Sequence, residues 1–152
     1  TKFMKIPSKF THFENENVLI VVTGAQDADI YLASNGVFEK IKSIMIPRKK
    51  YSDQEGFSVQ KSGVSGSARE YPKEAVRQEF LNQLENELKT ISKKEKITSV
   101  CLFSPDYFLK TVKSSFPYPL RDKISITVVG NFIHYQPFEI LEKIKLKIKK
   151  VI

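Results

Sequence analysis

Two apolar runs constrain the fold of this chain more than any other feature of its sequence. The first, Asn17–Gly24, reads NVLIVVTG, is rich in β-branched residues and ends at a glycine. The second, Ile97–Phe103, is nearly all apolar. β-Branched residues favour strands, and a short apolar run bounded by turn residues is typical of a buried strand. We therefore expect both runs to be strands, with the second one central in the sheet.

The first third of the chain is predicted to form an antiparallel meander. Asp27–Ala33 alternates apolar and polar residues, as a strand with one buried face does. Asn35-Gly36 follows, and Asn-Gly between two apolar runs is a strong hairpin signal because both residues tolerate positive φ. A third strand is then expected over Val37–Pro47.

The second half of the chain alternates helices with strands. Pro72 opens a predicted helix that reaches about Lys94, with apolar residues at spacings of three and four. These residues are Val76, Phe80, Leu81, Leu84, Leu88 and Ile91. A short helix over Tyr107–Phe116 and a strand over Ile124–Val129 follow. This order predicts parallel strands with helices packed on the sheet.

The C-terminal segment is open to two interpretations. A helical stripe is formed by Phe138, Leu141, Ile144, Ile148 and Val151. Lys143–Lys149, however, alternates lysine with apolar residues, which is the period of a strand. The preceding proline and glutamates favour the helix. The expected fold class is therefore α/β, a three-layer domain with a mixed five-stranded sheet.

Length and composition define the class of protein. The 152 residues have the size of one domain, and we expect residues 1–152 to form a single one. No apolar run reaches the roughly 18 residues that cross a membrane, and the first ten residues lack the apolar core of a signal peptide. The single cysteine, Cys101, cannot form an internal disulfide. These features predict a cytoplasmic protein.

The formal net charge of +8 is the main compositional signal. Excess positive charge favours phosphate-rich partners or anionic membrane surfaces, and the alternative is a lysine-rich composition without functional meaning. The charges cluster in two places, Arg48-Lys49-Lys50 and the tail lysines Lys143, Lys145, Lys147, Lys149 and Lys150. The tail could contact RNA phosphates or a membrane surface, or form a surface helix whose lysines are simply solvated.

The segment Arg48–Pro72 has no apolar periodicity and is rich in glycine and serine. Such a stretch is uncommon inside a compact domain unless it is functional or disordered. We expect a mobile loop over residues 48–72 and regard it as a candidate RNA or phosphate site, with a flexible surface loop as the alternative. The candidate contact residues are Arg48, Lys49, Lys50, Lys61, Gly63, Gly66, Ser67 and Arg69. The string GVSGSAR lacks the Gly-Lys-Ser/Thr ending of a P-loop.

Several strings occur in an order that resembles a known family. They are NVLIVVTGAQDADIY, EFLNQLENEL, VCLFSPDYFLKTVKSSF, PLRDKISITVVG and NFIHYQPFEILEKI. Together they resemble the bacterial relatives of the middle domain of archaeal and eukaryotic peptide-chain release factors. That group includes the small proteins named for attachment to host cells. The resemblance covers about Ile6 to Leu146 and implies a fold like that of the release-factor middle domain.

The catalytic motif of true release factors is missing. In that family, Gly-Gly-Gln followed by Ser-Ala-Arg helps to position the water that cleaves peptidyl-tRNA. This sequence keeps Ser67-Ala68-Arg69 but carries Val64-Ser65-Gly66 where the motif belongs. Gln60 is too far back to replace the glutamine without a different loop path. The resemblance therefore does not extend to peptide release.

Two histidines complete the list of polar candidates. His134 falls where relatives in the host-attachment group often carry a histidine, so the resemblance implies a polar site there. It would hold a backbone carbonyl or act as a general base, and the alternative is a structural histidine at a strand end. His12 cannot be paired with it from the sequence. Without a carboxylate cluster we expect no metal site, and Cys101 in mid-strand is no nucleophile.

Aromatic residues near the loop and the N-terminal segment are candidates for stacking on bases. They are Phe10, Phe13, Phe57 and Tyr71, and packing in the core is the alternative.

The sequence thus predicts a non-catalytic binding domain that contacts ribosomal or other structured RNA in translation or ribosome rescue. Two alternatives stay open. One is a peptidyl-tRNA or ester hydrolase that uses Ser65–Arg69 without the glutamine, and the other is a protein-interaction module linked to host attachment. No cofactor and no catalytic residue are expected. A protein partner also fits, and the residues leave the oligomeric state open.

Overall fold

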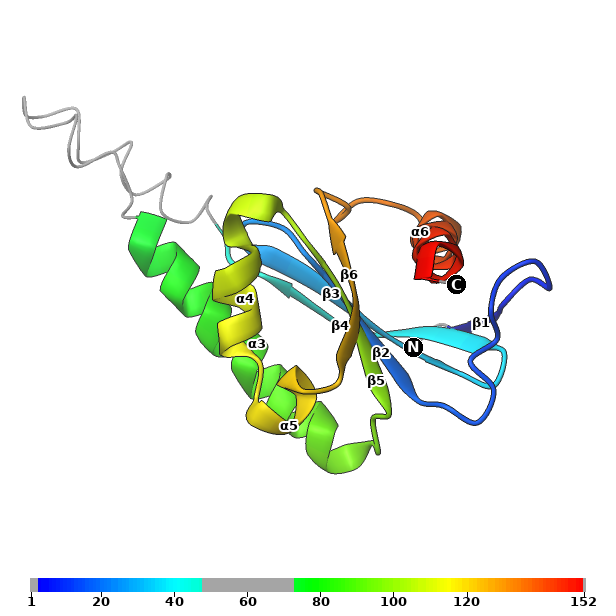
Figure 1. Cartoon of the computed structure of the whole chain (residues 1–152). Helices are drawn as coiled ribbons and strands as arrows, with labels where there is room; N and C mark the ends of the chain where they lie inside the picture. Colours follow the sequence, from blue (N-terminus) through cyan, green and yellow to red (C-terminus); the bar gives the residue numbers. More distant parts are fainter. Residues whose placement is uncertain (1–2, 48–72, 152) are drawn as a thin grey trace, which may run out of the picture.

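The structure, a computed structural model, describes residues 3–47 and 73–151 of the chain. Its elements follow one another as Figure 1 shows. They are β1 (Phe3–Lys5), β2 (Val18–Thr23), β3 (Asp27–Ser34), β4 (Val37–Met45), α3 (Lys73–Lys94), β5 (Ser99–Ser104), the short helix η1 (Asp106–Phe108), α4 (Leu109–Ser115), α5 (Tyr118–Arg121), β6 (Ile124–Val129) and α6 (Pro137–Val151).

The strands form one mixed sheet in the order β1-β4-β3-β2-β5-β6. β2, β3 and β4 are the predicted antiparallel meander. Its hairpin turns at Asn35 and Gly36, which have positive φ angles of 44° and 81°. β5 joins β2 in parallel, and β6 joins β5 in parallel. The predicted α/β class with a mixed sheet is therefore confirmed.

The predicted number of five strands is wrong, because the described residues form six. The additional strand, β1, has three residues and pairs antiparallel with β4, so that Phe3 lies opposite Glu39. Directly after it, the backbone N–H of Ile6 donates to the carbonyl oxygen of Gly36 at 2.8 Å. Three residues are too few to show a period of two, so this strand has no signal of its own in the sequence.

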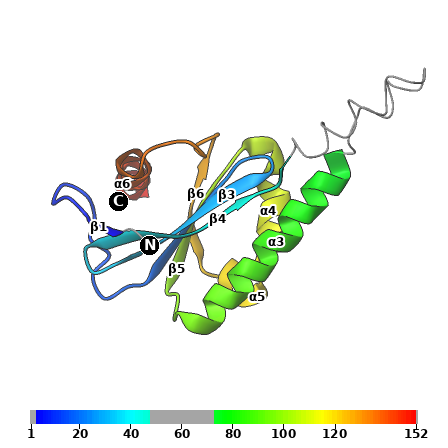
Figure 2. The ribbon, with the colours of Figure 1, turned by 180° about the vertical axis from the view of Figure 1, so that it is seen from behind.

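Helices cover both faces of the sheet (Figures 1 and 2): α3, α4 and α5 lie on one face and α6 on the other. All six residues of β2 are buried, because its alternate side chains enter two different cores. Leu19 packs in the α3 core with Phe80 and Leu84. Ile20 packs in the α6 core with Ile140. The domain therefore has the three layers that the sequence predicts.

Most of the apolar residues predicted to line the inner side of the two long helices are buried. On α3 all six stripe residues are buried, and Lys93 and Lys94 occupy the last turn, where the helix dipole attracts cations. Its predicted first residue, Pro72, lies outside the described residues. The predicted short helix after β5 is divided into η1 and α4.

In the two described ranges no helix combines the length and the apolar character that crossing a membrane requires.

The C-terminal segment is a helix and not a strand. Leu141 and Ile144 are buried on its inner side, as the helical stripe predicts, and Ile140, which the stripe did not include, is buried with them. Phe138 is an exception, because 52% of it is exposed. Residues at a spacing of two lie about 200° apart around a helix, so the alternation of lysine and apolar residues distributes both kinds around it.

We expect Cys101 to be chemically inert in the folded protein. It is 1% exposed in the middle of β5. Burial first, and then the carboxylate of Glu16, raises the pKa of its thiol from 9.0 to about 12. Because the thiolate is the reactive form, the folded protein should not react with a disulfide reagent at about pH 8, whereas the chain unfolded in guanidinium chloride should react rapidly. Rapid reaction in native buffer would contradict this burial.

The same shift predicts how stability depends on pH. The folded-state pKa lies above the unfolded value, so the contribution of the neutral thiol is fully present below about pH 9. Between about pH 9 and pH 12 the unfolded chain loses its proton and the folded chain keeps it, so the free energy of unfolding decreases. Denaturant titrations across this range, compared with Cys101→Ala, measure the effect. A Cys101→Ala variant with an equally steep decrease would assign the loss to other groups.

Candidate functional site at the carboxyl edge of the sheet

The parallel strands β2, β5 and β6 all end on the same side of the sheet. We call the row of strand ends there the carboxyl edge. Val22, Phe103 and Val128 lie side by side in register just before it. Three described connections leave from this edge: 24–26 after β2, 105–108 after β5 and 130–136 after β6. Ligands of open α/β sheets commonly bind beyond the carboxyl ends of the strands. This edge is therefore the first place to look for a site.

The chain also leaves and re-enters the described structure at the carboxyl edge. Met45, the last residue of β4, pairs with Asp27 at the start of β3, directly beyond the end of β2. The first turns of α3 reach the same edge, as Figure 1 shows, and the Arg77 guanidinium lies 5.3 Å from the centre of the Phe108 ring. The segment between β4 and α3 is thus anchored at this edge on both sides.

The predicted RNA or phosphate contacts belong to that segment and lie outside the described residues. They are Arg48, Lys49, Lys50, Lys61, Gly63, Gly66, Ser67 and Arg69. Their role stays a prediction. The described flanks, at Met45 and Lys73, bring both ends of the segment to the carboxyl edge.

Two fully buried hydroxyl groups lie at the ends of β2 and β5. Thr23 Oγ1 donates to the carbonyl oxygen of Phe103 at 3.0 Å, and Ser104 Oγ donates to that of Pro105 at 3.0 Å. The carbonyl oxygen of Ser104 in turn accepts the N–H of Gly130 at 2.9 Å. Both hydroxyl protons are used inside the protein. The Thr23 hydroxyl ties the end of β2 to β5, the Ser104 hydroxyl bonds locally, and neither points to catalysis.

An aromatic column leads from the α6 core to the surface at this edge. The Phe132 ring packs edge-on against Phe103, with 5.5 Å between ring centres, and against Tyr135 at 4.8 Å. Lys143 of α6 holds its Nζ 5.5 Å from the centre of the Phe132 ring. Tyr135 at the outer end is 39% exposed. The cation therefore lies against the inner ring of the column, one ring away from the exposed Tyr135.

His134 lies exposed in the connection between β6 and α6. Within the described part of the chain no hydrogen bond or ion pair holds its imidazole. Its neighbour Ile133 packs near Gly24, at the end of β2, and anchors the connection there. His12 lies at the opposite edge, where its carbonyl oxygen accepts the N–H of Gly36. The two histidines therefore do not form one site.

Large exposed apolar side chains gather at the carboxyl edge. Seven such residues are exposed in the described ranges, and four of them, Met45, Tyr107, Val129 and Tyr135, belong to it. Tyr107 is 68% exposed in η1, directly after β5. Aromatic rings left in water next to cations are suited to stacking on a planar ligand.

Sequence reasoning did not name these two tyrosines and named Phe10, Phe13, Phe57 and Tyr71 instead. Phe10 and Phe13 are 6% and 7% exposed in the α6 core, so packing in the core, the alternative stated for them, is confirmed. Phe57 and Tyr71 lie outside the described residues. The signal for Tyr107 was its place in a polar Pro-Asp-Tyr turn after a buried strand, where a phenol tip can stay in water.

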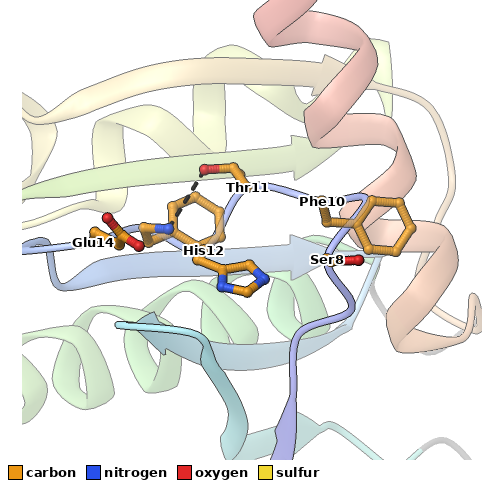
Figure 3. Close-up of a pocket in the computed structure, with 6 residues that line it drawn as sticks. Ser8, Phe10, Thr11, His12 and Glu14 are labelled. Atoms are coloured by element: carbon orange, nitrogen blue, oxygen red, sulfur yellow. Dashed lines mark hydrogen bonds between the residues drawn. The ribbon is translucent and has the colours of Figure 1, made fainter.

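A shallow, open hollow of about 420 Å³ lies at the opposite edge, formed by the N-terminal segment (Figure 3). Ser8, Thr11, His12 and Glu14 contribute to its lining. Thr11 Oγ1 already accepts the backbone N–H of Phe13 at 3.4 Å, and His12 Nε2 lies 3.3 Å from the carbonyl oxygen of Pro7. Its polar groups serve the loop itself. Nowhere in 3–47 or 73–151 do three His, Cys, Asp or Glu side chains gather as metal ligands would.

We expect Gly130→Ala to destabilise the carboxyl edge. Gly130 has a φ of 147°, and a Cβ there would lie 2.7 Å from Cε2 of Phe132. Strain of this kind costs roughly 1–3 kcal/mol, so the melting temperature should fall in circular dichroism melts. Ser125→Ala, at an exposed position of β6, the strand that precedes Gly130, is the control and should change stability by less than about 0.5 kcal/mol. A Gly130→Ala variant as stable as this control would contradict the described loop.

Two solved structures resemble this chain over 90% of its length. An archaeal translation termination factor aligns with a TM-score of 0.52 and 15% identity, and a chain described only as an archaeal protein aligns with 0.53 and 15%. This chain spans 35% and 34% of those chains, about a third of each. No protein-family model matches the sequence, and no curated protein matches it. At such low identity the likeness shows the fold alone, and that fold is release-factor-like.

Proposed function

We propose that this chain is a non-catalytic RNA-binding domain whose carboxyl edge contacts ribosomal or other structured RNA. The observation that supports it best is the pair of exposed tyrosines at this edge, Tyr107 and Tyr135. Stacking of a base on an aromatic ring accepts all four bases and contributes roughly 1–3 kcal/mol per base. The tyrosines therefore suit RNA loops or ends with unpaired bases, the usual targets of RNA-binding proteins.

Each of these tyrosines has a cation one side-chain contact away. Lys143 lies over Phe132, and Phe132 packs against Tyr135. Arg77 lies over the ring of the residue next to Tyr107. An aromatic platform beside a positive charge is the combination with which proteins bind single-stranded nucleic acid, the ring for the base and the cation for the phosphate.

The contacts expected from the sequence would extend this proposed interface. The segment between β4 and α3 contributes Arg48, Lys49, Lys50, Lys61, Gly63, Gly66, Ser67 and Arg69, and α6 contributes Lys143. The other tail lysines, Lys145, Lys147, Lys149 and Lys150, follow along α6, and Lys145 Nζ lies 5.8 Å from the centre of the Phe10 ring, away from the carboxyl edge. Together with the net charge of +8, they favour a partner with many phosphates. Binding that neutralises phosphates releases counterions, so it weakens steeply as the salt concentration rises.

The proposal is one of binding and not of hydrolysis. Val64-Ser65-Gly66 stands where release factors carry Gly-Gly-Gln, and the hydroxyls of Thr23 and Ser104 donate to backbone carbonyls. The likeness to an archaeal termination factor makes ribosomal RNA the first target to test. A cytoplasmic location and kinship with the host-attachment proteins belong to the same proposal.

We expect Tyr107→Ala/Tyr135→Ala to weaken RNA binding by about 30-fold to 20,000-fold, since two stacking contacts of roughly 1–3 kcal/mol each are lost. Fluorescence anisotropy with labelled ribosomal RNA hairpins at low salt measures the affinity. The salt dependence should not change, because no phosphate contact is removed.

Tyr118→Ala is the matched control. Tyr118 is 69% exposed, almost as Tyr107 is, but it lies in α5, which leads into β6 at the opposite edge. It should bind RNA like the unmodified protein. Equal losses for both variants would assign the effect to general surface apolarity, and binding that is undetectable at low salt would refute the proposed function.

A further inference from the structure

The two outer strands of the sheet differ in how they avoid pairing with other chains. β1, the outermost strand on one side, has three residues and ends in the exposed Lys5. β6, the outermost strand on the other side, is six residues long and reads ISITVV, without charge, proline or glycine. Natural proteins keep outer strands short or place charges and prolines on them, because an open strand recruits another strand. β6 carries neither of these protections.

The outer side of β6 is open in the described structure. β6 pairs with β5 alone, and in Figure 1 it runs along the front of the molecule with no other described element in front of it. Alternate residues of such a strand turn their backbone N–H and C=O groups away from the only neighbour. A register shift near Ile124 gives β6 one irregularity at its start. From Ile126 to Val129 the ladder is regular, and Val129 leaves 48% of its surface in water.

We propose that β6 pairs antiparallel with β6 of a second copy of this chain, so that two six-stranded sheets become one continuous sheet. Antiparallel pairing about a two-fold axis keeps each face of one copy in line with the same face of the other. Opposed residues must therefore share a face, so the axis passes through a residue and not between two. Ile126 and Thr127 are the two central residues of β6 and give the longest ladders. In both registers β-branched residues from the two copies meet across the junction, and such pairs stabilise a sheet.

The local charges around β6 are compatible with a second copy on its outer side. The charged residues next to β6 are all on its N-terminal side, in Arg121-Asp122-Lys123. In an antiparallel pair the N-terminal side of one copy meets the C-terminal side of the other. Lys123 then lies opposite Val129 or Asn131, and no like charges face each other in either register. A strand of another protein could use the same side of β6, but a second copy is the occupant that the chain itself supplies, with an uncharged strand of equal length.

The net charge of +8 gives this association a distinctive salt dependence. Two copies repel each other at long range, and salt screens that repulsion with a decay length of about 8 Å at physiological ionic strength. The pairing should therefore strengthen with added salt, whereas binding of RNA to the carboxyl edge should weaken. The salt dependence separates the two events in one preparation.

Sedimentation equilibrium of nuclease-treated protein tests the pairing. The expected mass is twice the chain mass of 17.5 kDa, with the dimer fraction rising with salt. Thr127→Lys and Thr127→Glu should each be monomeric, since each brings like charges together across the junction, and an equimolar mixture of the two should form a heterodimer. Thr111→Lys, at an exposed position of α4, is the control and should remain dimeric.

A second measurement does not depend on the folding of any variant. Hydrogen exchange of the β6 amides in the unmodified protein should slow as the protein concentration increases, because the pairing protects the outward N–H groups. A protein that stays monomeric at high concentration and high salt would overturn the proposal. So would a dimer that Thr127→Lys leaves intact while its β6 amides exchange independently of concentration.

Discussion

The parallel pairing of β2 with β5 is the interaction on which the rest of the molecule depends. Both strands are buried on both faces, so two helical layers are required to shield them from water. A parallel pair also needs a crossover, and α3 provides it on one face. The side chain of Asn17 ties this pair at its start by donating to the carbonyl oxygen of Lys96 at 3.0 Å. The carboxyl edge exists because these strands, and β6 beside them, run in the same direction.

The elements that were predicted well are those whose signal lies within a short stretch of sequence. The apolar run of β2, the hairpin at Asn35-Gly36 and the stripe of α3 each follow from residue type and spacing alone. β1 could not be predicted, since three residues become a strand only when the edge of β4 is present. The segment after Gln136 carried two periods at once, and its helix is decided by the sheet face that Ile140 and Ile144 cover. In both cases tertiary contacts supplied the information that the local sequence lacks.

The candidate site was harder to predict than the fold, because exposure depends on how the chain wraps. Phe10 and Phe13 look like surface aromatics in a polar stretch, but the N-terminal segment folds over the α6 face and buries both. Phe13 even adopts a φ of 52° to do so, a conformation that bulky residues rarely accept. Tyr107 and Tyr135 are exposed in the connections that follow β5 and β6. Sequence reasoning pointed to the basic segment between β4 and α3, but not to these side chains.

The anchoring of both ends of the segment between β4 and α3 at one edge has a consequence for how such a domain can change over time. For a connection held at both ends, doubling the number of residues costs only about 0.6 kcal/mol of closure entropy. Changes in the length of this connection are thus inexpensive for folding. A lineage can lengthen or shorten the segment while the sheet that carries it stays the same.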